Sequence, residues 1–222
     1  MKAMVLAAGL GTRMGRLTET TPKPLLDVGG ETLLGRQLAR LAAAGVTHAV
    51  INVARLGERI RAAIGDGRRF GLRVEYSDEG PVPLETAGGI LRALPLLGSE
   101  PFIIANADVL TDFDFRRLRL DGAEGQIVLV PNPPHHERGD FALGEDGFVT
   151  AAGPRLTYAG IALFDPMLFR GRTPGPGPLK PILDEAIARG ALRGLRHDGL
   201  WIDVGTPERL EAARAAVAEE KR

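Results

Sequence analysis

The first half of the chain alternates between short apolar runs and stretches with helical spacing. Three apolar runs, at residues 3–8, 48–53 and 101–108, and a strand-like stretch at 72–77 predict four strands. Three stretches have the spacing of helices, at residues 32–45, 56–67 and 88–98. Because successive parallel strands need right-handed crossovers, this order predicts an α/β fold with a mostly parallel sheet covered by helices on both faces.

The second half has a less regular pattern. Three apolar runs again indicate strands, at residues 126–131, 156–164 and 200–205, and helical spacing returns at 179–190 and 206–220. Residues 144–148 have the pattern of a hairpin turn, whereas 171–178 contain too much Pro and Gly for regular structure. With no repeat and no long linker, we expect one domain over residues 1–222, with the irregular half laid over one end of the sheet.

The composition is that of an ordinary globular protein, 44% hydrophobic and 25% charged. Its 28 basic and 28 acidic residues balance, so the net charge gives no reason to expect nucleic acid or a membrane surface as a partner. There is no cysteine, which excludes disulfides, thiol nucleophiles and cysteine-bound zinc. No apolar run has the length of a membrane span and no signal-peptide pattern follows Met1, so we expect a cytoplasmic protein.

A glycine loop, Gly9 to Arg13, follows the first predicted strand. Ligands of open α/β sheets bind outside the carboxyl ends of the strands, and glycine lets backbone N–H groups come close to a phosphate. The loop lacks the Gly-Lys-Ser/Thr ending of a P-loop. A dinucleotide-binding loop would run on into a helix, but Pro22 and Pro24 interrupt the chain there, and Lys23 stands between them. Neither of these two loop types therefore explains the stretch.

The motifs resemble those of the sugar-1-phosphate nucleotidyltransferases. LAAGLGTRM…TPKPLL resembles the family's signature, and LETAGGI, NAD, RGDF, YAGI and WIDVGT follow in order, so the resemblance covers nearly the whole chain. It implies a Rossmann-like three-layer sandwich with a mostly parallel mixed sheet. The nucleotide-binding part would span about residues 1–110 and the sugar-phosphate-binding part about 111–222. It also implies attack of a sugar 1-phosphate on a nucleoside triphosphate, with release of pyrophosphate.

Such a reaction needs positioning and charge stabilisation rather than a general base, because the nucleophile is already an anionic phosphate oxygen. Arg13 can hold the triphosphate and the departing pyrophosphate in a forked grip, and Lys23 can neutralise oxygens of the α-phosphate, so both are candidate catalytic residues. Glu85 has two interpretations, a contact to the base or ribose and a favourable acid at a helix N-terminus. The resemblance implies nucleotide contacts at Ala8, Gly9, Gly11, Thr12, Arg13, Lys23, Glu85, Thr86, Gly88 and Asn106.

Asp108 and Asp203 lie at or within apolar strands, too far apart in the sequence for the sequence alone to bring them together. The resemblance implies that both bind a catalytic magnesium ion that bridges the two phosphate groups. Hard oxygen ligands from one or two carboxylates, completed by substrate phosphates and water, suit Mg²⁺. We therefore expect Mg²⁺ as the cofactor.

The acceptor sugar is expected against the second half of the chain. By resemblance, Asp140 contacts sugar hydroxyls and Gly160 lets the sugar phosphate approach the backbone. Asn106 and Lys180 are further candidate substrate contacts. Within the family, the short length and the variants PLETAGG, HHERGDF and WIDVGTPERL are most similar to the branch that acts on N-acetylmuramate 1-phosphate with UTP.

N-acetylmuramate carries a lactyl carboxylate, which simple hexoses lack. A cation near Asp140 is expected to meet it, and His135, His136 and Arg138 are the nearest candidates in sequence. His48 and His197 lie beside predicted strands and are expected to be structural.

Other functions remain open at this point. The same chemistry can serve mannose 1-phosphate with GTP, or glucose 1-phosphate with UTP or dTTP. A nucleotide-binding module without turnover is disfavoured because Arg13, Lys23, Asp108 and Asp203 are all present. An NAD(P)-dependent oxidoreductase would need a hydride-relay residue that the sequence does not offer. Members of this family that have further C-terminal domains often use them for oligomerisation. The given chain ends soon after its last predicted helix, so we expect a monomer.

Overall fold

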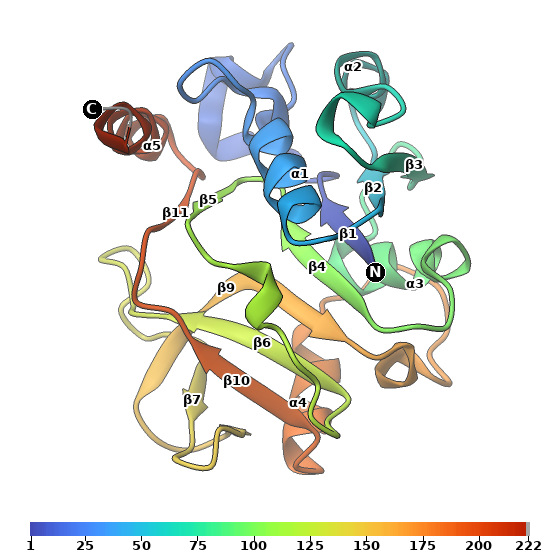
Figure 1. Ribbon diagram of the computed structural model, residues 1–222, viewed down its shortest axis with the longest axis vertical. Helices are drawn as coiled ribbons and strands as arrows, with labels where there is room; N and C mark the ends of the chain where they lie inside the picture. The colour runs from blue at the N-terminus through green and yellow to red at the C-terminus, as the bar shows by residue number, and fades with distance from the viewer. Residues whose placement is uncertain (221–222) are drawn as a thin grey trace.

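The first half of the chain forms four strands of one sheet in the computed structural model, which describes residues 1–220 (Figure 1). These strands are β1 (Lys2–Leu6), β2 (His48–Val53), β3 (Arg73–Asp78) and β4 (Phe102–Asn106). The helices between them are α1 (Leu33–Ala43), α2 (Gly57–Ile64) and α3 (Glu85–Leu97). Short 3-10 helices are η1 (Thr12–Thr18), η2 (Lys23–Leu25) and η3 (Arg68–Phe70). The predicted alternation of strand and helix is therefore confirmed.

The second half contains more strands than its sequence pattern predicts. Its strands are β5 (Val109–Thr111), β6 (Gly125–Val130), β7 (Phe141–Leu143), β8 (Val149–Thr150), β9 (Arg155–Phe164), β10 (Leu192–Arg196) and β11 (Trp201–Asp203). Its helices are η4 (Phe115–Arg117), η5 (Pro166–Phe169), α4 (Lys180–Ala188) and α5 (Pro207–Glu220). The predicted hairpin turn joins β7 to β8.

The main sheet has the strand order β10-β6-β9-β4-β1-β2-β3. Pairs among β1 to β4 are parallel, as is β10 with β6, whereas β9 is antiparallel to both β4 and β6. The expectation that the second half lies over one end of the sheet is wrong, because β6, β9 and β10 extend the sheet itself. The long strand β9 makes this possible by pairing along β4 on one side and β6 on the other.

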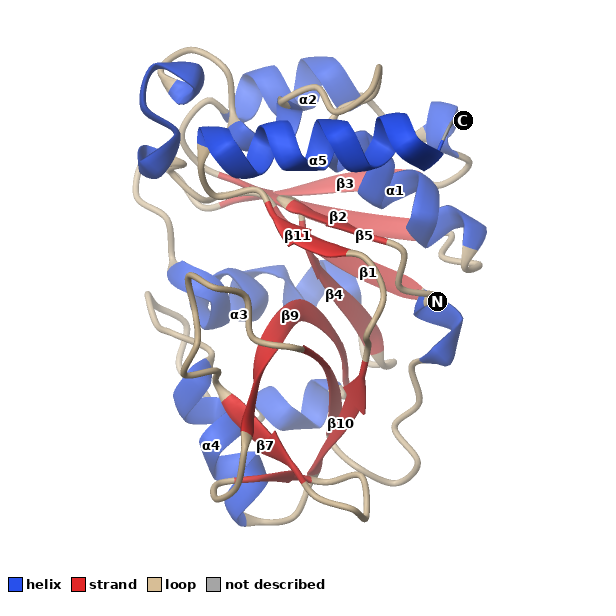
Figure 2. Cartoon of the chain, turned by 90° about the vertical axis from the view of Figure 1, so that its left-hand side faces the viewer, coloured by secondary structure: helices blue, strands red, loops and turns tan. Residues whose placement is uncertain are grey.

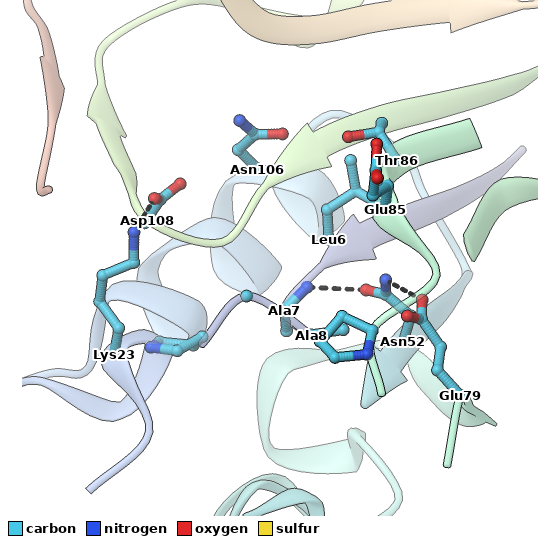
Figure 3. Close-up of a pocket in the computed structure, with 13 residues that line it drawn as sticks. Leu6, Ala7, Ala8, Lys23, Asn52, Glu79, Glu85, Thr86, Asn106 and Asp108 are labelled. Atoms are coloured by element: carbon cyan, nitrogen blue, oxygen red, sulfur yellow. Dashed lines mark hydrogen bonds and ion pairs between the residues drawn. The ribbon is translucent and has the colours of Figure 1, made fainter. Parts of the chain in front are cut away.

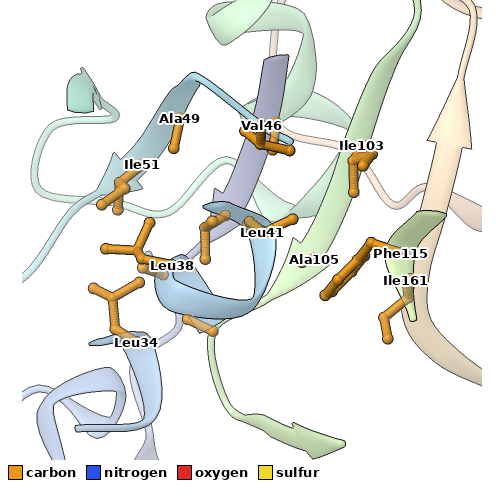
Figure 4. Close-up of a cluster of buried hydrophobic side chains, with 14 of the residues drawn as sticks. Leu34, Leu38, Leu41, Val46, Ala49, Ile51, Ile103, Ala105, Phe115 and Ile161 are labelled. Carbon is orange, nitrogen blue, oxygen red and sulfur yellow. The ribbon is translucent and has the colours of Figure 1, made fainter. Parts of the chain in front are cut away.

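Helices cover both faces of the sheet, as the alternation of buried side chains along β1 requires. Ala3 and Val5 contribute to a core beneath α1 and α2, whereas Met4 contributes to a second core with α3 and α4. Figure 4 shows the part of the first core in which Leu34, Leu38 and Leu41 of α1 face the sheet. The arrangement is a three-layer sandwich of mixed, mostly parallel type, visible from the side in Figure 2. Among residues 1–220, no helix combines the length and apolarity needed to cross a membrane.

A two-stranded ribbon of β5 and β11 brings the end of the chain back to the first half. Helix α5 follows this ribbon and packs on it through Leu210, Ala213 and Val217, in a third core that also contains Met14 of η1. The glycine loop, the end of β4 and the start of α5 thereby lie at one edge of the molecule (Figure 2).

Candidate active site

Four adjoining cavities lie along the carboxyl ends of β1 and β4. The loop cavity, of about 210 Å³, is drawn in Figure 3 and lies between the glycine loop and the start of α3; its walls include Ala8, Gly9, Lys23, Glu79, Thr86 and Asp108. The arginine cavity is lined by Gly11, Thr12, Arg13, Lys23 and Gly205. The carboxylate cavity includes Asn106, Asp108, His135, Gly160, Trp201 and Asp203. The lysine cavity includes Glu85, Asn106, Asp140, Tyr158 and Lys180.

A buried chain of hydrogen bonds fixes the beginning of the glycine loop. The Ala7 N–H donates to Asn52 Oδ1 at 2.7 Å, and Asn52 Nδ2 donates to Glu79 Oε1 at 2.6 Å. The other Glu79 oxygen accepts from the Leu84 N–H at 2.6 Å, one residue before α3. Asn52 is 3% exposed and Glu79 is 7% exposed, so each buried polar group depends on this chain for its partners. The chain ties the glycine loop to β2 and α3 (Figure 3).

Lys23 forms an ion pair with Asp108, as Figure 3 shows. Pro22 and Pro24 fix the backbone on both sides of Lys23, and the 3-10 helix η2 begins at Lys23. Asp108 lies in the two-residue turn between β4 and β5, at the carboxyl end of β4. The structure therefore joins two predicted site residues from opposite ends of the first half.

Asp203 lies beside Asp108 because β5 and β11 pair antiparallel. In this ladder Asp203 is opposite Val109, and the Val204 N–H donates to the Asp108 carbonyl at 2.8 Å. Both carboxylates line the carboxylate cavity. Within residues 1–220 there is no group of three or more His, Cys, Asp or Glu side chains that could hold a metal. Two neighbouring carboxylates fit Mg²⁺, which readily takes its remaining ligands from phosphates and water.

Two further side chains contact Asp203. Arg209 Nη1, from the first turn of α5, donates to both Asp203 oxygens at 2.7 and 2.8 Å. His135 Nε2 lies 3.1 Å from Asp203 Oδ1 and also contacts Arg209 Nη1. The predicted candidate His135 thus lies at the carboxylate pair rather than beside Asp140.

Arg13 lies between the arginine and carboxylate cavities and lines both. Its side chain has no hydrogen-bond or ion-pair partner within residues 1–220. Gly11, with φ of +66°, precedes η1 and directs the chain back across the loop; an added Cβ would lie 3.2 Å from the Thr18 side chain. The turn leaves Arg13 exposed at the cavity mouth.

Asp140 is held by two contacts at the wall of the lysine cavity. Its Oδ1 lies 3.0 Å from His136 Nε2, and its Oδ2 accepts from the Tyr158 N–H at 2.8 Å. The Tyr158 hydroxyl is buried and has no hydrogen-bond partner within the described chain, and burial raises the pKa of this phenol. It therefore stays protonated and can donate to a ligand. Arg138 is exposed and lies in none of the four cavity walls as described.

Lys180 begins α4 and pairs with Asp184 at 2.7 Å, while lining the lysine cavity. Gly160, with φ of +71°, lines the carboxylate cavity, where an added Cβ would overlap the Asn106 side chain. The packing of the Asn106 side chain therefore already requires a glycine at this position.

The start of α3 differs from its predicted form. The helix begins at Glu85, which has φ of +58°, a strained value for a residue with a side chain, and Glu85 faces both the loop and lysine cavities. Thr86 lines the same two cavities. Gly88 instead packs against residues 175–177: its N–H donates to the Gly177 carbonyl at 3.3 Å, and an added Cβ would overlap the Gly175 carbonyl oxygen.

The remaining histidines lie outside this site. His48 pairs with Glu75 at 2.6 Å, and the buried His197 pairs with Asp112 at 2.9 Å and packs edge-on against Phe113. Sequence reasoning missed Asn52, Glu79 and Arg209. Asn52 has a recognisable signal, a polar residue within the apolar run HAVINV, but Arg209 has none in a helix rich in charged residues.

The site and fold together define a nucleotide-transferring enzyme, and comparisons agree. Residues 2–139 match the family model described as nucleotidyl transferase. Two relatives are named N-acetylmuramate alpha-1-phosphate uridylyltransferase: one from Neisseria meningitidis serogroup B, 47% identical with 97% of each chain covered, and one from Caulobacter vibrioides, 37% identical with 98% of this chain and 97% of the relative covered. The chain belongs to the sugar-1-phosphate nucleotidyltransferase family.

More distant matches point the same way. A mannose-1-phosphate guanyltransferase from Aspergillus fumigatus is 33% identical over 94% of this chain and 62% of its own length. Among solved structures, HddC from Yersinia pseudotuberculosis has a TM-score of 0.82 and 22% identity, with 97% of this chain and 99% of that chain covered. The latter similarity confirms the fold.

Proposed function

We propose that this enzyme transfers a uridylyl group from UTP to N-acetylmuramate alpha-1-phosphate, giving UDP-N-acetylmuramate and pyrophosphate, in peptidoglycan recycling. The observation that carries the chemistry is the pair Asp108 and Asp203, side by side across β5 and β11, with Lys23 and Arg13 at the same edge. The two relatives at 47% and 37% identity support the choice of substrates.

The four cavities suggest where the substrates lie. The base and ribose would occupy the loop cavity between Ala8 and Thr86, and the triphosphate would follow Gly9, Gly11 and Thr12 into the arginine cavity. The acceptor phosphate would enter the carboxylate cavity, with its sugar in the lysine cavity against Asp140. Asn106 lines three of these cavities and would contact both substrates.

In the reaction an oxygen of the sugar phosphate forms a bond to the α-phosphorus of UTP. The bond from that phosphorus to the bridging oxygen of the β-phosphate breaks, and pyrophosphate leaves with the electron pair. No proton needs to move, so the protein's task is to hold and stabilise charge. Lys23 neutralises the α-phosphate oxygens and Arg13 holds the departing pyrophosphate in a bidentate grip.

Asp108 and Asp203 would hold Mg²⁺, which would act as a Lewis acid on the phosphoryl oxygens. Lys23 and Arg209 neutralise these carboxylates in the structure, and both would have to give up these contacts for the carboxylates to hold a divalent ion.

The lactyl carboxylate of the acceptor requires a cation at the sugar end. His136, which contacts Asp140 and lines the carboxylate cavity, is the best placed of the three predicted candidates. Arg138 is the least well placed.

The function is tested by measuring pyrophosphate release with magnesium. UTP, GTP, CTP, ATP and dTTP are each combined with the 1-phosphates of N-acetylmuramate, N-acetylglucosamine, glucose and mannose. We expect turnover with UTP and the muramate phosphate only. Turnover with GTP and mannose 1-phosphate would retain the mechanism and contradict the proposed substrates. Binding of UTP without turnover in any combination would contradict the proposed enzyme.

A further inference from the structure

In the mechanism above Arg209 only neutralises Asp203, although it lies within the site. Its guanidinium is largely buried, with 16% of the side chain exposed, and it comes from α5, the last helix of the described chain. Its Nη1 is fully engaged, because it contacts both oxygens of Asp203 and also His135. Its Nε is buried and has no hydrogen-bond partner within residues 1–220.

The second terminal nitrogen of this guanidinium, Arg209 Nη2, lies near Gly205 and faces Arg13. A Cβ added at Gly205 would overlap Arg209 Nη2 and would lie 3.3 Å from Arg13 Nη2. Two arginines from opposite ends of the chain therefore approach one point in the wall of the arginine cavity, where Gly205 leaves room for both. Arg13 has no anionic partner in the described chain, and the single carboxylate at Arg209 is Asp203.

This arrangement is favourable only when an anion lies between the two guanidinium groups. Like charges at such short range repel, and the repulsion is strongest in a partly buried site. Phosphate oxygens relieve it, because each guanidinium presents a planar fork of donors that matches a phosphate edge. Asp203 balances Arg209 only until a divalent metal ion occupies that carboxylate.

We propose that Arg209 is a second pyrophosphate-binding residue, which shares the departing diphosphate with Arg13 across Gly205 and is held by Asp203 until the metal binds. The inference rests on the proposed function, since it assumes a triphosphate in the arginine cavity. A diphosphate is favoured over a group of the acceptor because Gly205 and Arg13 line the same cavity as Gly11, Thr12 and Lys23. If Asp203 held a metal ion, the Arg209 guanidinium would be free to turn its donors to the β- and γ-phosphates.

The test is calorimetric binding of inorganic pyrophosphate to the full chain, with and without saturating magnesium. Arg209→Gln is compared with Arg209→Lys and with the control Arg214→Gln. Arg214 lies on the same helix and, within residues 1–220, contacts only Glu211 and the Asp27 carbonyl at the surface. With magnesium, we expect Arg209→Gln to weaken pyrophosphate binding by about 10- to 100-fold, Arg209→Lys to retain part of the affinity, and Arg214→Gln to bind as the unaltered chain does. Without magnesium the three should differ little.

Binding of Mn²⁺ separates this role from a merely structural one. If Arg209 only positions Asp203, its loss should weaken Mn²⁺ binding, and that result would overturn the proposal. We expect Mn²⁺ to bind Arg209→Gln at least as tightly as the unaltered chain, because a competing cation has been removed. Unchanged pyrophosphate affinity in Arg209→Gln would also overturn it, as would a change confined to the preference between muramate and glucosamine phosphates. Failure of the proposed function is distinguishable, since the unaltered chain would then not bind pyrophosphate.

Discussion

Replacement of Asn52 by Asp tests the buried chain that anchors the glycine loop. The side chains have nearly the same shape, and the new carboxylate can still accept from the Ala7 N–H, now bonded at 2.7 Å. What changes is the contact with Glu79. Asn52 Nδ2 donates to Glu79 Oε1 at 2.6 Å, and in Asn52→Asp a second carboxyl oxygen takes the place of that donor.

Two carboxylates at this separation cannot both ionise at low cost, so the folded variant must keep one proton between them. The introduced carboxyl group then has a raised pKa in the folded state. When the pKa of a carboxyl group is higher in the folded state than in the unfolded state, its contribution to the free energy of unfolding is greatest below the unfolded pKa of about 4. This contribution falls as the pH rises towards the folded pKa. A rise of about 3 pKa units, reasonable for groups as buried as these, corresponds to about 4 kcal/mol lost between about pH 4 and pH 7.

The assay is denaturant unfolding at pH 5 and pH 8, followed by fluorescence of Trp201, the single tryptophan of the chain. Asn52→Asp should be much closer to the unaltered chain at pH 5 than at pH 8. The matched control combines Asn52→Asp with Glu79→Gln, which exchanges amide and carboxylate and leaves one buried charge. This double variant should lose the extra pH dependence. An equal loss of stability at both pH values would refute the reasoning, because no shared proton would then be involved.

Three further predictions concern the site and the core. Lys23→Ala should lower kcat by about 100- to 1000-fold, as expected for loss of a charge that stabilises the transition state, with UTP binding changed far less; single-turnover kinetics with binding calorimetry separate the two effects. Tyr158→Phe removes a buried hydroxyl that has no partner in the described chain, so stability should not fall, while KM for the sugar phosphate alone should rise; thermal unfolding and steady-state kinetics test both parts. Leu38→Ala, in the core under α1, should cost about 2–5 kcal/mol of unfolding free energy, whereas Leu10→Ala, with Leu10 45% exposed, should change it by less than about 0.5 kcal/mol.

The sequence predicts the first half of the fold well because strand and helix periods there differ clearly. β1, β2 and β4 are nearly continuous apolar runs, as strands buried on both faces must be. The edge strand β3, RVEYSD, instead alternates apolar and polar side chains. The sequence pattern did not predict β5 and β10, and both omissions have a physical reason. β5 has three residues, too few for a periodic signal, and β10 reads LRGLR, in which arginine and glycine mask an edge strand.

The sequence supplies candidate residues for the site, but it could not predict how these residues come together. The pairing of β5 with β11 that brings Asp203 next to Asp108 joins segments about 90 residues apart and is accompanied by the packing of α5 against Leu110 of β5, both of which are long-range effects. The strained backbone of Glu85 likewise depends on the contacts of the α3 start with Glu79 and residues 175–177. Such constraints arise in the folded chain and leave no local pattern.

Charge explains why the composition gave no hint of an anionic substrate. The chain as a whole is neutral, with 28 residues of each sign. Yet Lys23, Arg13 and Arg209 lie around Asp108 and Asp203 at the phosphate end of the described site, so this end carries a surplus of positive charge. The other carboxylates of the cavity walls, Glu79, Glu85 and Asp140, line the cavities proposed for the base and the sugar. A divalent ion would raise that surplus further, and a triphosphate with a second phosphate would then offset it. Magnesium and nucleotide should therefore bind with positive cooperativity, since each reduces the cost of placing the other in this partly buried site.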